Sequence, residues 1–147
     1  MTVSLERIVE TLPAGFSELE ADARANGHRH MTRLAVEFKN NRAMFHAIFA
    51  CNFDGRFIGI GAITHEPTQT SRPMWRMRRL YVHQNFRQQT IAHTMANALL
   101  SEAVGNLSRV TVHAGSDGAA RFWEAIGFNR VEGQPWSHEA AVPTVDR

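Results

Sequence analysis

Apolar residues follow two different spacings along this chain, and together they predict a fold that mixes helices and strands. Near the beginning, residues 17–26 and 29–41 carry apolar positions at helical spacing on either side of Gly27. Ser17 is the expected N-cap of the first helix, because Glu20 follows it at the distance of a capping box. The pattern therefore predicts a pair of helices ahead of the first strands.

Strand spacing takes over after the second helix. Apolar runs at residues 45–52 and 56–65 flank an Asp-Gly dipeptide, which is a strong signal for a β-hairpin. The second run contains Gly59 and Gly61. Glycine inside a strand often marks a place where another backbone or a ligand approaches closely, so we expect such an approach here.

The second half of the chain alternates strands with helices. Further strands are expected at residues 74–82, at 109–114, from 128 onward and at 137–142. The helix after the first of them carries the core-facing stripe Ile91, Met95, Leu99 and Ala103. The last helix, capped by Ser116 or Asp117 and ended by Gly127, is expected to bury the face made by Ala119, Phe122 and Ile126. This order predicts a mixed α/β sheet flanked by helices.

The stretch from Leu80 to Ala92 reads as a strand that leads through a short polar turn into a helix. The first amides of a helix have no partner inside it, and with the helix dipole they form a site for anions. Arg87 adds a positive charge at this turn. A ligand that carries phosphate is therefore expected here.

Composition narrows the class of protein. The 147 residues fit a single domain, 1–147, with 44% hydrophobic and 20% charged residues and a net charge of +2. The lone cysteine, Cys51, is expected to be a small buried residue. Because the sequence shows neither a signal-peptide pattern nor an apolar run of about 18 residues, we expect a cytoplasmic protein with no membrane association.

Five arginines gather within a short stretch, namely Arg72, Arg76, Arg78, Arg79 and Arg87. They can serve nucleic acid, an acidic substrate or an anionic cofactor, or simply form a solvated face that protects an edge strand. Nucleic acid is the weakest of these readings, because the net charge is small and few aromatic residues lie among the arginines.

Two segments resemble the GNAT superfamily of acyl-CoA-dependent N-acetyltransferases. Arg87-Gln88-Gln89-Thr90-Ile91-Ala92 is similar to the family's phosphate signature, and Ala119-Ala120-Arg121-Phe122-Trp123-Glu124-Ala125-Ile126-Gly127-Phe128 is similar to its second conserved segment. The resemblance covers about residues 45–142. It implies a mostly antiparallel sheet of about six to seven strands with one splayed pair, and transfer of an acetyl group from acetyl-CoA to a primary amine.

The resemblance also implies where the cofactor lies. The strand before the turn would pair with the pantetheine arm, and the turn amides would hold the pyrophosphate. The residues placed at the cofactor in this way are Leu80, Tyr81, Val82, Arg87, Gln88, Gln89, Thr90, Ile91, Ala92, Ser116, Phe122 and Trp123.

Three of these residues depart from the family pattern. Thr90 stands where glycine is usual, and its β-branched side chain is expected to weaken cofactor binding without abolishing it. Trp123 replaces a tyrosine that would protonate the departing thiolate, and an indole cannot give up a proton near neutral pH. Ser116 stands where asparagine is frequent. A binding module with little or no catalysis is therefore an alternative to an enzyme.

Acetyl transfer needs an oxyanion donor and a general base. The backbone N–H of Val82 or Leu80 is the expected donor, and His113 and Glu66 are the main candidates for the base, with His65 and His83 also open. The histidines show no spacing typical of zinc ligands, so no metal is expected. The acceptor is expected to be a small-molecule or peptide amine. The sequence does not decide the oligomeric state, and a homodimer is left open.

Overall fold

The computed structural model describes residues 2–68, 72–87, 89–105 and 109–142, with only the backbone of Gln89. Along the chain the elements are β1 (Val3–Arg7), α1 (Phe16–Ala25), α2 (His30–Asn40), β2 (Phe45–Phe53), β3 (Arg56–His65), β4 (Trp75–Val82), α3 (Gln89–Ala103), β5 (Arg109–Val112), α4 (Asp117–Ile126), β6 (Asn129–Arg130) and β7 (His138–Ala141).

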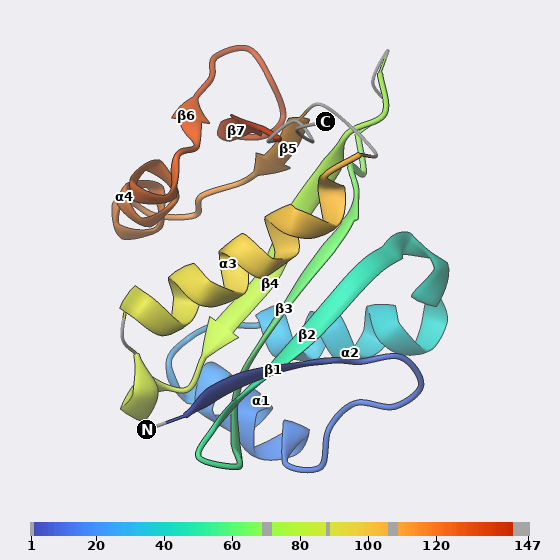
Figure 1. The fold of residues 1–147 in the computed structure, drawn as a ribbon, viewed down its shortest axis with the longest axis vertical. Coiled ribbons are helices and arrows are strands. Elements are labelled where there is room, and N and C mark those ends of the chain that lie inside the picture. Colours follow the sequence, from blue (N-terminus) through green and yellow to red (C-terminus); the bar gives the residue numbers. More distant parts are fainter. Residues whose placement is uncertain (1, 69–71, 88, 106–108, 143–147) are drawn as a thin grey trace.

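Within the described residues, the strands form one seven-stranded sheet in the order β1-β2-β3-β4-β5-β7-β6. Neighbouring strands run antiparallel except β4 and β5, which are parallel. Helices α1 and α2 cover one face of the sheet and α3 crosses the other, while α4 lies beside β6 (Figure 1). The predicted mixed, mostly antiparallel sheet with flanking helices is confirmed.

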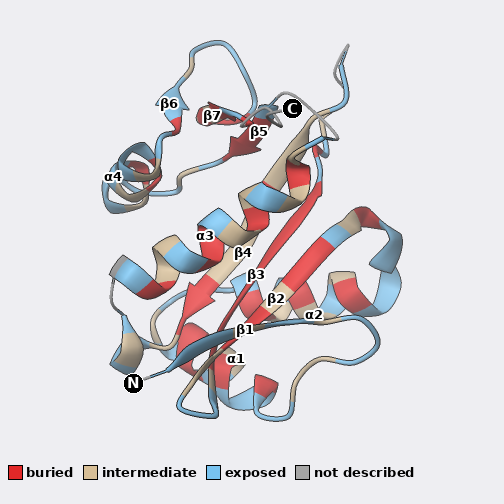
Figure 2. Cartoon of the chain, viewed as in Figure 1, coloured by how far each residue is buried: buried red, intermediate tan, exposed pale blue. Residues whose placement is uncertain are grey.

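Burial follows these layers. Strands β3 and β5 are the most buried part of the sheet, β2 and β4 are partly buried, and β1 is exposed at its edge (Figure 2). The predicted stripe of α3 is confirmed, since Ile91, Met95, Leu99 and Ala103 are all buried. Cys51 is buried as expected, and burial raises the pKa of its thiol.

Three local expectations were wrong. Strand β1 was not predicted. Helix α1 begins at Phe16 after a left-handed Gly15, so Ser17 lies inside the first turn and caps nothing. In α4 the buried residues are Ala120 and Trp123, whereas Phe122 and Ile126 are only partly buried against the core and Ala119 lines a cavity. Ser116 is the cap of α4 and Gly127 ends it, as expected.

The close approach predicted at Gly59 and Gly61 comes from β4 and α3. A Cβ at Gly59 would lie 3.0 Å from the Tyr81 carbonyl oxygen, and one at Gly61 would lie 3.0 Å from Leu80 Cδ1. The register between β3 and β4 shifts here, and Arg79 takes a φ of 60°. A bulge in β4 therefore sits against the small surface that glycine leaves.

The pair β4–β5 is splayed. The two strands pair only at Trp75 with Val110 and at Arg76 with Thr111. From Met77 onward β4 pairs with no strand on that side among the described residues, although its other side stays paired with β3 up to Val82. This opening beside β4 positions the site described next.

Candidate functional site

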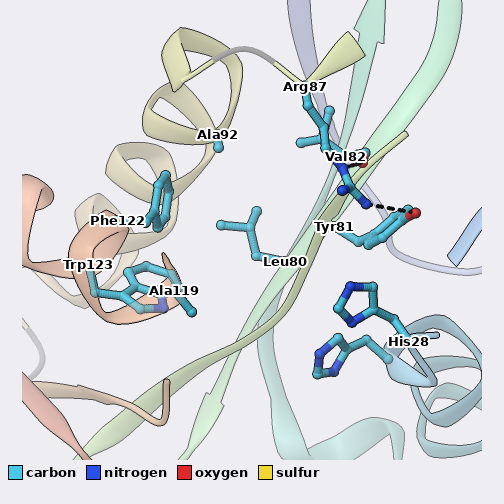
Figure 3. Close-up of a pocket in the computed structure, with 10 residues that line it drawn as sticks. His28, Leu80, Tyr81, Val82, Arg87, Ala92, Ala119, Phe122 and Trp123 are labelled. Atoms are coloured by element: carbon cyan, nitrogen blue, oxygen red, sulfur yellow. Dashed lines mark hydrogen bonds between the residues drawn. The ribbon is translucent and has the colours of Figure 1, made fainter. Parts of the chain in front are cut away.

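A cavity of about 470 Å³ lies beside the unpaired stretch of β4. Figure 3 shows side chains of α4 on one side of it, those of β4 along its length and His28 on the opposite side. Its lining is mainly apolar and consists of His28, His30, Leu80, Tyr81, Val82, Arg87, Ala92, Ala119, Phe122 and Trp123. A long, largely apolar ligand fits such a wall.

The backbone of β4 offers hydrogen bonds to this cavity. The N–H of His83 donates to Ile58 of β3, and the Val82 carbonyl accepts from Arg87 on the other side. Because successive residues of a strand direct their amides to opposite edges, the N–H and carbonyl groups of Val82 point away from β3, toward the missing pairing. They can bind a ligand that lies along β4.

The far end of the cavity meets the start of α3. The first amides of this 15-residue helix have no partner within it, and Ala92 and Arg87 line the cavity there. Thr90 is exposed in the first turn, and its φ is not positive, so this backbone does not need glycine. The arrangement is that of an anion site at a helix N-terminus.

A buried carboxylate anchors this end of β4. Asp22 of α1 accepts a hydrogen bond of 2.5 Å from the Tyr81 hydroxyl and one of 3.1 Å from the Gln84 N–H. The Tyr81 hydroxyl in turn accepts from Arg87 Nη2 at 3.1 Å, the bond dashed in Figure 3. His83 Nε2 lies 3.4 Å from Asp22. Tyr81 and Arg87 are thus held in fixed positions at the cavity wall.

The charges in this network shift two pKa values in opposite directions. Burial by itself raises the pKa of Asp22, but the hydrogen bonds from Tyr81 and Gln84, with the charges of His83 and Arg87, hold it below its ordinary value. Burial and the hydrogen bond to Asp22 raise the pKa of Tyr81. Asp22 therefore stays ionised and Tyr81 stays a neutral phenol at neutral pH.

A second cavity of about 430 Å³ adjoins the first on the α2 side of β4. Both cavities are lined by His30, Leu80, Ala119 and Trp123. The rest of its lining is strongly cationic and consists of Arg33, Arg76, Met77, Arg78, Arg79, Val112, His113 and Gly115. An apolar channel thus opens into a chamber with polar, charged walls.

Two glutamates pair with most of these arginines. Glu37 of α2 accepts from Arg79 Nε at 2.9 Å and from Arg78 Nη2 at 2.8 Å. Glu66 accepts from Arg76 Nε at 2.8 Å. The interpretation that these arginines protect an edge strand was wrong, since β4 is an interior strand of the sheet.

The family of this chain follows from a comparison of its sequence with a family model. The model of the acetyltransferase (GNAT) family matches residues 12–128, most of the chain. This chain belongs to the GNAT acetyltransferase family. No curated protein sequence matches it. The resemblance drawn from the two motifs is therefore confirmed.

Solved structures share the GNAT fold of this chain. A provisionally assigned acetyltransferase from Exiguobacterium sp. 255-15 has a TM-score of 0.82 at 21% identity, covering 96% of this chain and 94% of its own. The GNAT family N-acetyltransferase YhbS from Escherichia coli, in complex with CoA, has a TM-score of 0.67 at 13% identity, with coverages of 96% and 82%. At these identities the likeness concerns the fold.

A third neighbour has a protein partner. It is a tyrosine-to-phenylalanine mutant of the toxin AtaT bound to the C-terminus of the antitoxin AtaR and acetyl-CoA. It has a TM-score of 0.71 at 13% identity and covers 97% of this chain and 94% of its own. GNAT-fold neighbours thus include complexes with CoA, with acetyl-CoA and with a partner protein.

The structure gathers many of the residues that sequence placed at the cofactor of this GNAT protein. Seven of them line the first cavity, namely Leu80, Tyr81, Val82, Arg87, Ala92, Phe122 and Trp123. The backbones of Gln89, Thr90 and Ile91 form the first turn of α3, with the Ile91 side chain buried in the core. Ser116 does not line it, because its hydroxyl accepts from the Ala119 N–H. Gln88 lies outside the described residues.

The three residues predicted to be catalytic lie in different places. Val82 lines the first cavity and the exposed His113 lines the second. Glu66 lines neither, and its side chain is only 1% exposed. Its Oε1 accepts from Arg76 and Thr111, both at 2.8 Å, and its Oε2 from the Thr68 N–H at 2.6 Å.

The bonds of Glu66 set its charge state. Burial by itself raises the pKa of Glu66, but the hydrogen bonds from Thr68, Thr111 and Arg76 and the charge of Arg76 hold it below its ordinary value. A carboxylate that already accepts three hydrogen bonds is a poor base for an incoming proton. Its contacts tie β3 to β4 and β5 at the vertex of the splay.

Two histidines at the cavities escaped the sequence prediction. His28 and His30 lie at the turn between α1 and α2, with their rings stacked 5.6 Å apart. Desolvation of the His30 ring lowers its pKa, and the charges of Arg79, His28, Arg33 and Arg78 lower it further. His30 is therefore neutral at neutral pH. The only available signal was the His-x-His pattern of His28 and His30 at the junction of the two predicted helices.

Two further findings concern the described part of the chain. It contains no group of three or more histidine, cysteine, aspartate or glutamate side chains that could hold a metal ion. None of its helices is both long and apolar enough to cross a membrane.

Proposed function

We propose that this GNAT protein is an N-acetyltransferase that uses acetyl-CoA and acetylates a primary amine. The observation that carries the proposal is the apolar cavity beside the unpaired amides of β4, which ends at the N-terminus of α3. Leu80, Val82 and Phe122 would hold the pantetheine arm. The amides of the first turn of α3 and Arg87 would bind the pyrophosphate.

Acetyl-CoA would supply a thioester whose carbonyl carbon is attacked by the amine nitrogen, so that an amide C–N bond forms, the C–S bond breaks and CoA leaves as its thiol. The chain would contribute three things to this reaction. The N–H of Val82 or Leu80 would donate to the developing oxyanion. The walls of the two cavities would align the reactants. A base would take a proton from the amine.

His30 is our proposal for that base. It lines both cavities, so it stands where donor and acceptor would meet, and it is neutral at neutral pH. His113 lines only the second cavity and is the alternative. We propose a bracing role at the vertex of the splay for Glu66, because its carboxylate is buried and already occupied.

Calorimetry with acetyl-CoA, followed by thiol release from acetyl-CoA with a panel of amines, tests the proposal. Saturable binding of acetyl-CoA together with amine-dependent thiol release would support it. Absence of binding would overturn it.

A binding module without efficient catalysis is the second candidate. Trp123 provides no dissociable hydroxyl at the cavity wall, and the Tyr81 hydroxyl already donates to Asp22. Acetyl-CoA binding without turnover across the panel would favour this alternative. The single domain and the cytoplasmic location remain parts of our proposal for this protein.

A further inference from the structure

We propose that the second cavity is the acceptor site and that it selects amines carrying an anionic group, a carboxylate or a phosphate; this inference rests on the proposed acetyl transfer. The cavity holds about 430 Å³, the size range of sites for small molecules. It shares His30, Leu80, Ala119 and Trp123 with the first cavity. An amine bound in it would therefore approach the apolar channel directly.

The charge of the wall carries the inference. Four arginines line the cavity, and the carboxylates that pair with them are Glu37 and Glu66. Glu37 serves both Arg78 and Arg79, which leaves one positive charge in excess. The side chain of Arg33, an exposed residue of α2, has no hydrogen bond or ion pair within the described ranges, which leaves a second.

Part of this excess positive charge, on Arg78 and Arg79, is shielded from water. The side chains of Arg78 and Arg79 are only 17% and 11% exposed. Burial and the neighbouring charge of Arg79 lower the pKa of Arg78, so Glu37 does not fully offset the two guanidinium groups. A charge-assisted hydrogen bond from such a wall to a carboxylate or phosphate is stronger than one in open solvent.

These arginines are separate from the expected pyrophosphate site. Arg79 lies three residues before Val82 in β4 and Arg76 lies six residues before it, which at about 3.3 Å per residue is roughly 10 Å and 20 Å of strand. The turn into α3 continues beyond Val82. The cationic wall is thus free for a different anion.

A positive wall also acts on the amine itself. It disfavours an ammonium ion and so helps to produce the neutral amine that acetyl transfer needs. The same wall repels acceptors with several positive charges. The expected order of preference is therefore anionic amines first, neutral amines second and polyamines last.

Matched amines measure this preference. β-Alanine and β-alaninamide differ by one negative charge, phosphoethanolamine and ethanolamine differ by nearly two at neutral pH, and spermidine adds positive charge. We expect each anionic member to bind the CoA-loaded protein in calorimetry about 10- to 100-fold more tightly than its neutral partner, and to release thiol from acetyl-CoA at a lower KM. The two anionic amines also distinguish a carboxylate site from a phosphate site.

Arg33→Gln should narrow the difference between the charged and the neutral partner, because it removes one of the two excess positive charges and so weakens the anionic amine more than the neutral one. Arg29→Gln is the control, because it removes the same charge one helical turn earlier, outside the second cavity. If Arg33→Lys keeps the preference for the anionic amine, the loss in Arg33→Gln is due to the missing positive charge.

The outcomes separate this inference from the proposed function. Equal binding of charged and neutral partners, no binding of either, or an anion preference that is undiminished in Arg33→Gln would overturn the inference even if acetyl-CoA binds and turnover occurs. Failure to bind acetyl-CoA at all would overturn the proposed function, whatever the amines do.

Discussion

The two ends of β4 are built for opposite tasks, although each is anchored by one buried carboxylate. At the closed end, Trp75 and Arg76 pair with β5, and Glu66 links β4 and β5 through Arg76 and Thr111. At the open end, Leu80 to Val82, the partner strand is missing and Asp22 anchors Tyr81 from the opposite face. The closed end brings three strands together, whereas the open end keeps backbone amides available to a ligand.

This contrast explains why charge and shape differ along one strand. Where strands meet, a buried carboxylate must be satisfied by cations and hydroxyls, since an unpaired charge in the interior is costly. Where they part, apolar side chains and free amides form a wall. The substitutions that follow act on one end or the other and run from the largest expected effect to the smallest.

At the open end, His30→Gln should lower kcat about 100- to 10,000-fold while the Kd of acetyl-CoA stays unchanged. His113→Gln is the matched control and should cost much less. Because the neutral imidazole is the active form and its pKa is lowered, the wild-type rate should fall only below about pH 6.5, and this acid limb should vanish in the variant. A large loss confined to His113→Gln would contradict the assignment.

At the closed end, Glu66→Ala should reduce the free energy of unfolding by about 3–5 kcal/mol, because it strands the Arg76 guanidinium beside β5. Urea unfolding measures the change. Glu102→Ala, which removes a glutamate from the exposed pair with Arg7, should cost less than about 1 kcal/mol.

The isosteric Glu66→Gln decides between bracing and catalysis at the closed end. We expect Glu66→Gln to have a lower free energy of unfolding than the wild type and to keep most of its kcat when folded. A stable Glu66→Gln protein that has lost its turnover would show instead that Glu66 is the base.

Asp22→Asn tests the anchor of the open end. The folded pKa of Asp22 is lowered, so its stabilisation is present above the unfolded value of about 3.9 and is lost as pH falls through the folded pKa. We expect a loss of about 1–3 kcal/mol at pH 7 and a flatter decline of stability below about pH 4. An unchanged acid decline would mean that the carboxylate of Asp22 is not what holds Tyr81.

Thr90→Gly should have the smallest effect. Only the bulk of the side chain is removed, since the backbone at Thr90 has no positive φ. Acetyl-CoA should bind a few-fold more tightly, less than the tenfold change that corresponds to about 1.4 kcal/mol. Thr94→Gly, one turn further along α3, controls for the loss of helix stability. Unchanged affinity would refute the expected penalty of threonine at this turn.

The sequence predicted the elements whose pattern is periodic and mostly buried. The stripe of α3 and the β2–β3 hairpin are regular enough to be read locally. Strand β1 lies at an exposed edge and carries Glu6 and Arg7, so its alternation gives little apolar signal. In α4 the Trp123 and Phe128 rings pack against each other across the helix end at Gly127, a local contact that the helical spacing of Ala119, Phe122 and Ile126 does not reveal.

The candidate site was predictable only in part. The strand, turn and helix around Arg87 follow from local chemistry and from the family motif. The roles of His30 and Arg33 depend on α2 packing against β4, which is a long-range contact. The burial of Glu66 between three strands likewise depends on topology. Sequence alone therefore could not show whether Glu66 is a general base or a structural carboxylate that links the strands.

The most direct test of the central claim, that the opening beside Leu80 to Val82 is the acyl-CoA channel, is a crystal structure of the protein grown with CoA. We predict that the pantetheine arm lies between β4 and α4, hydrogen-bonded to the β4 amides, with the pyrophosphate at the first turn of α3 beside Arg87. Density for CoA elsewhere on the protein, with this opening empty, would contradict the account.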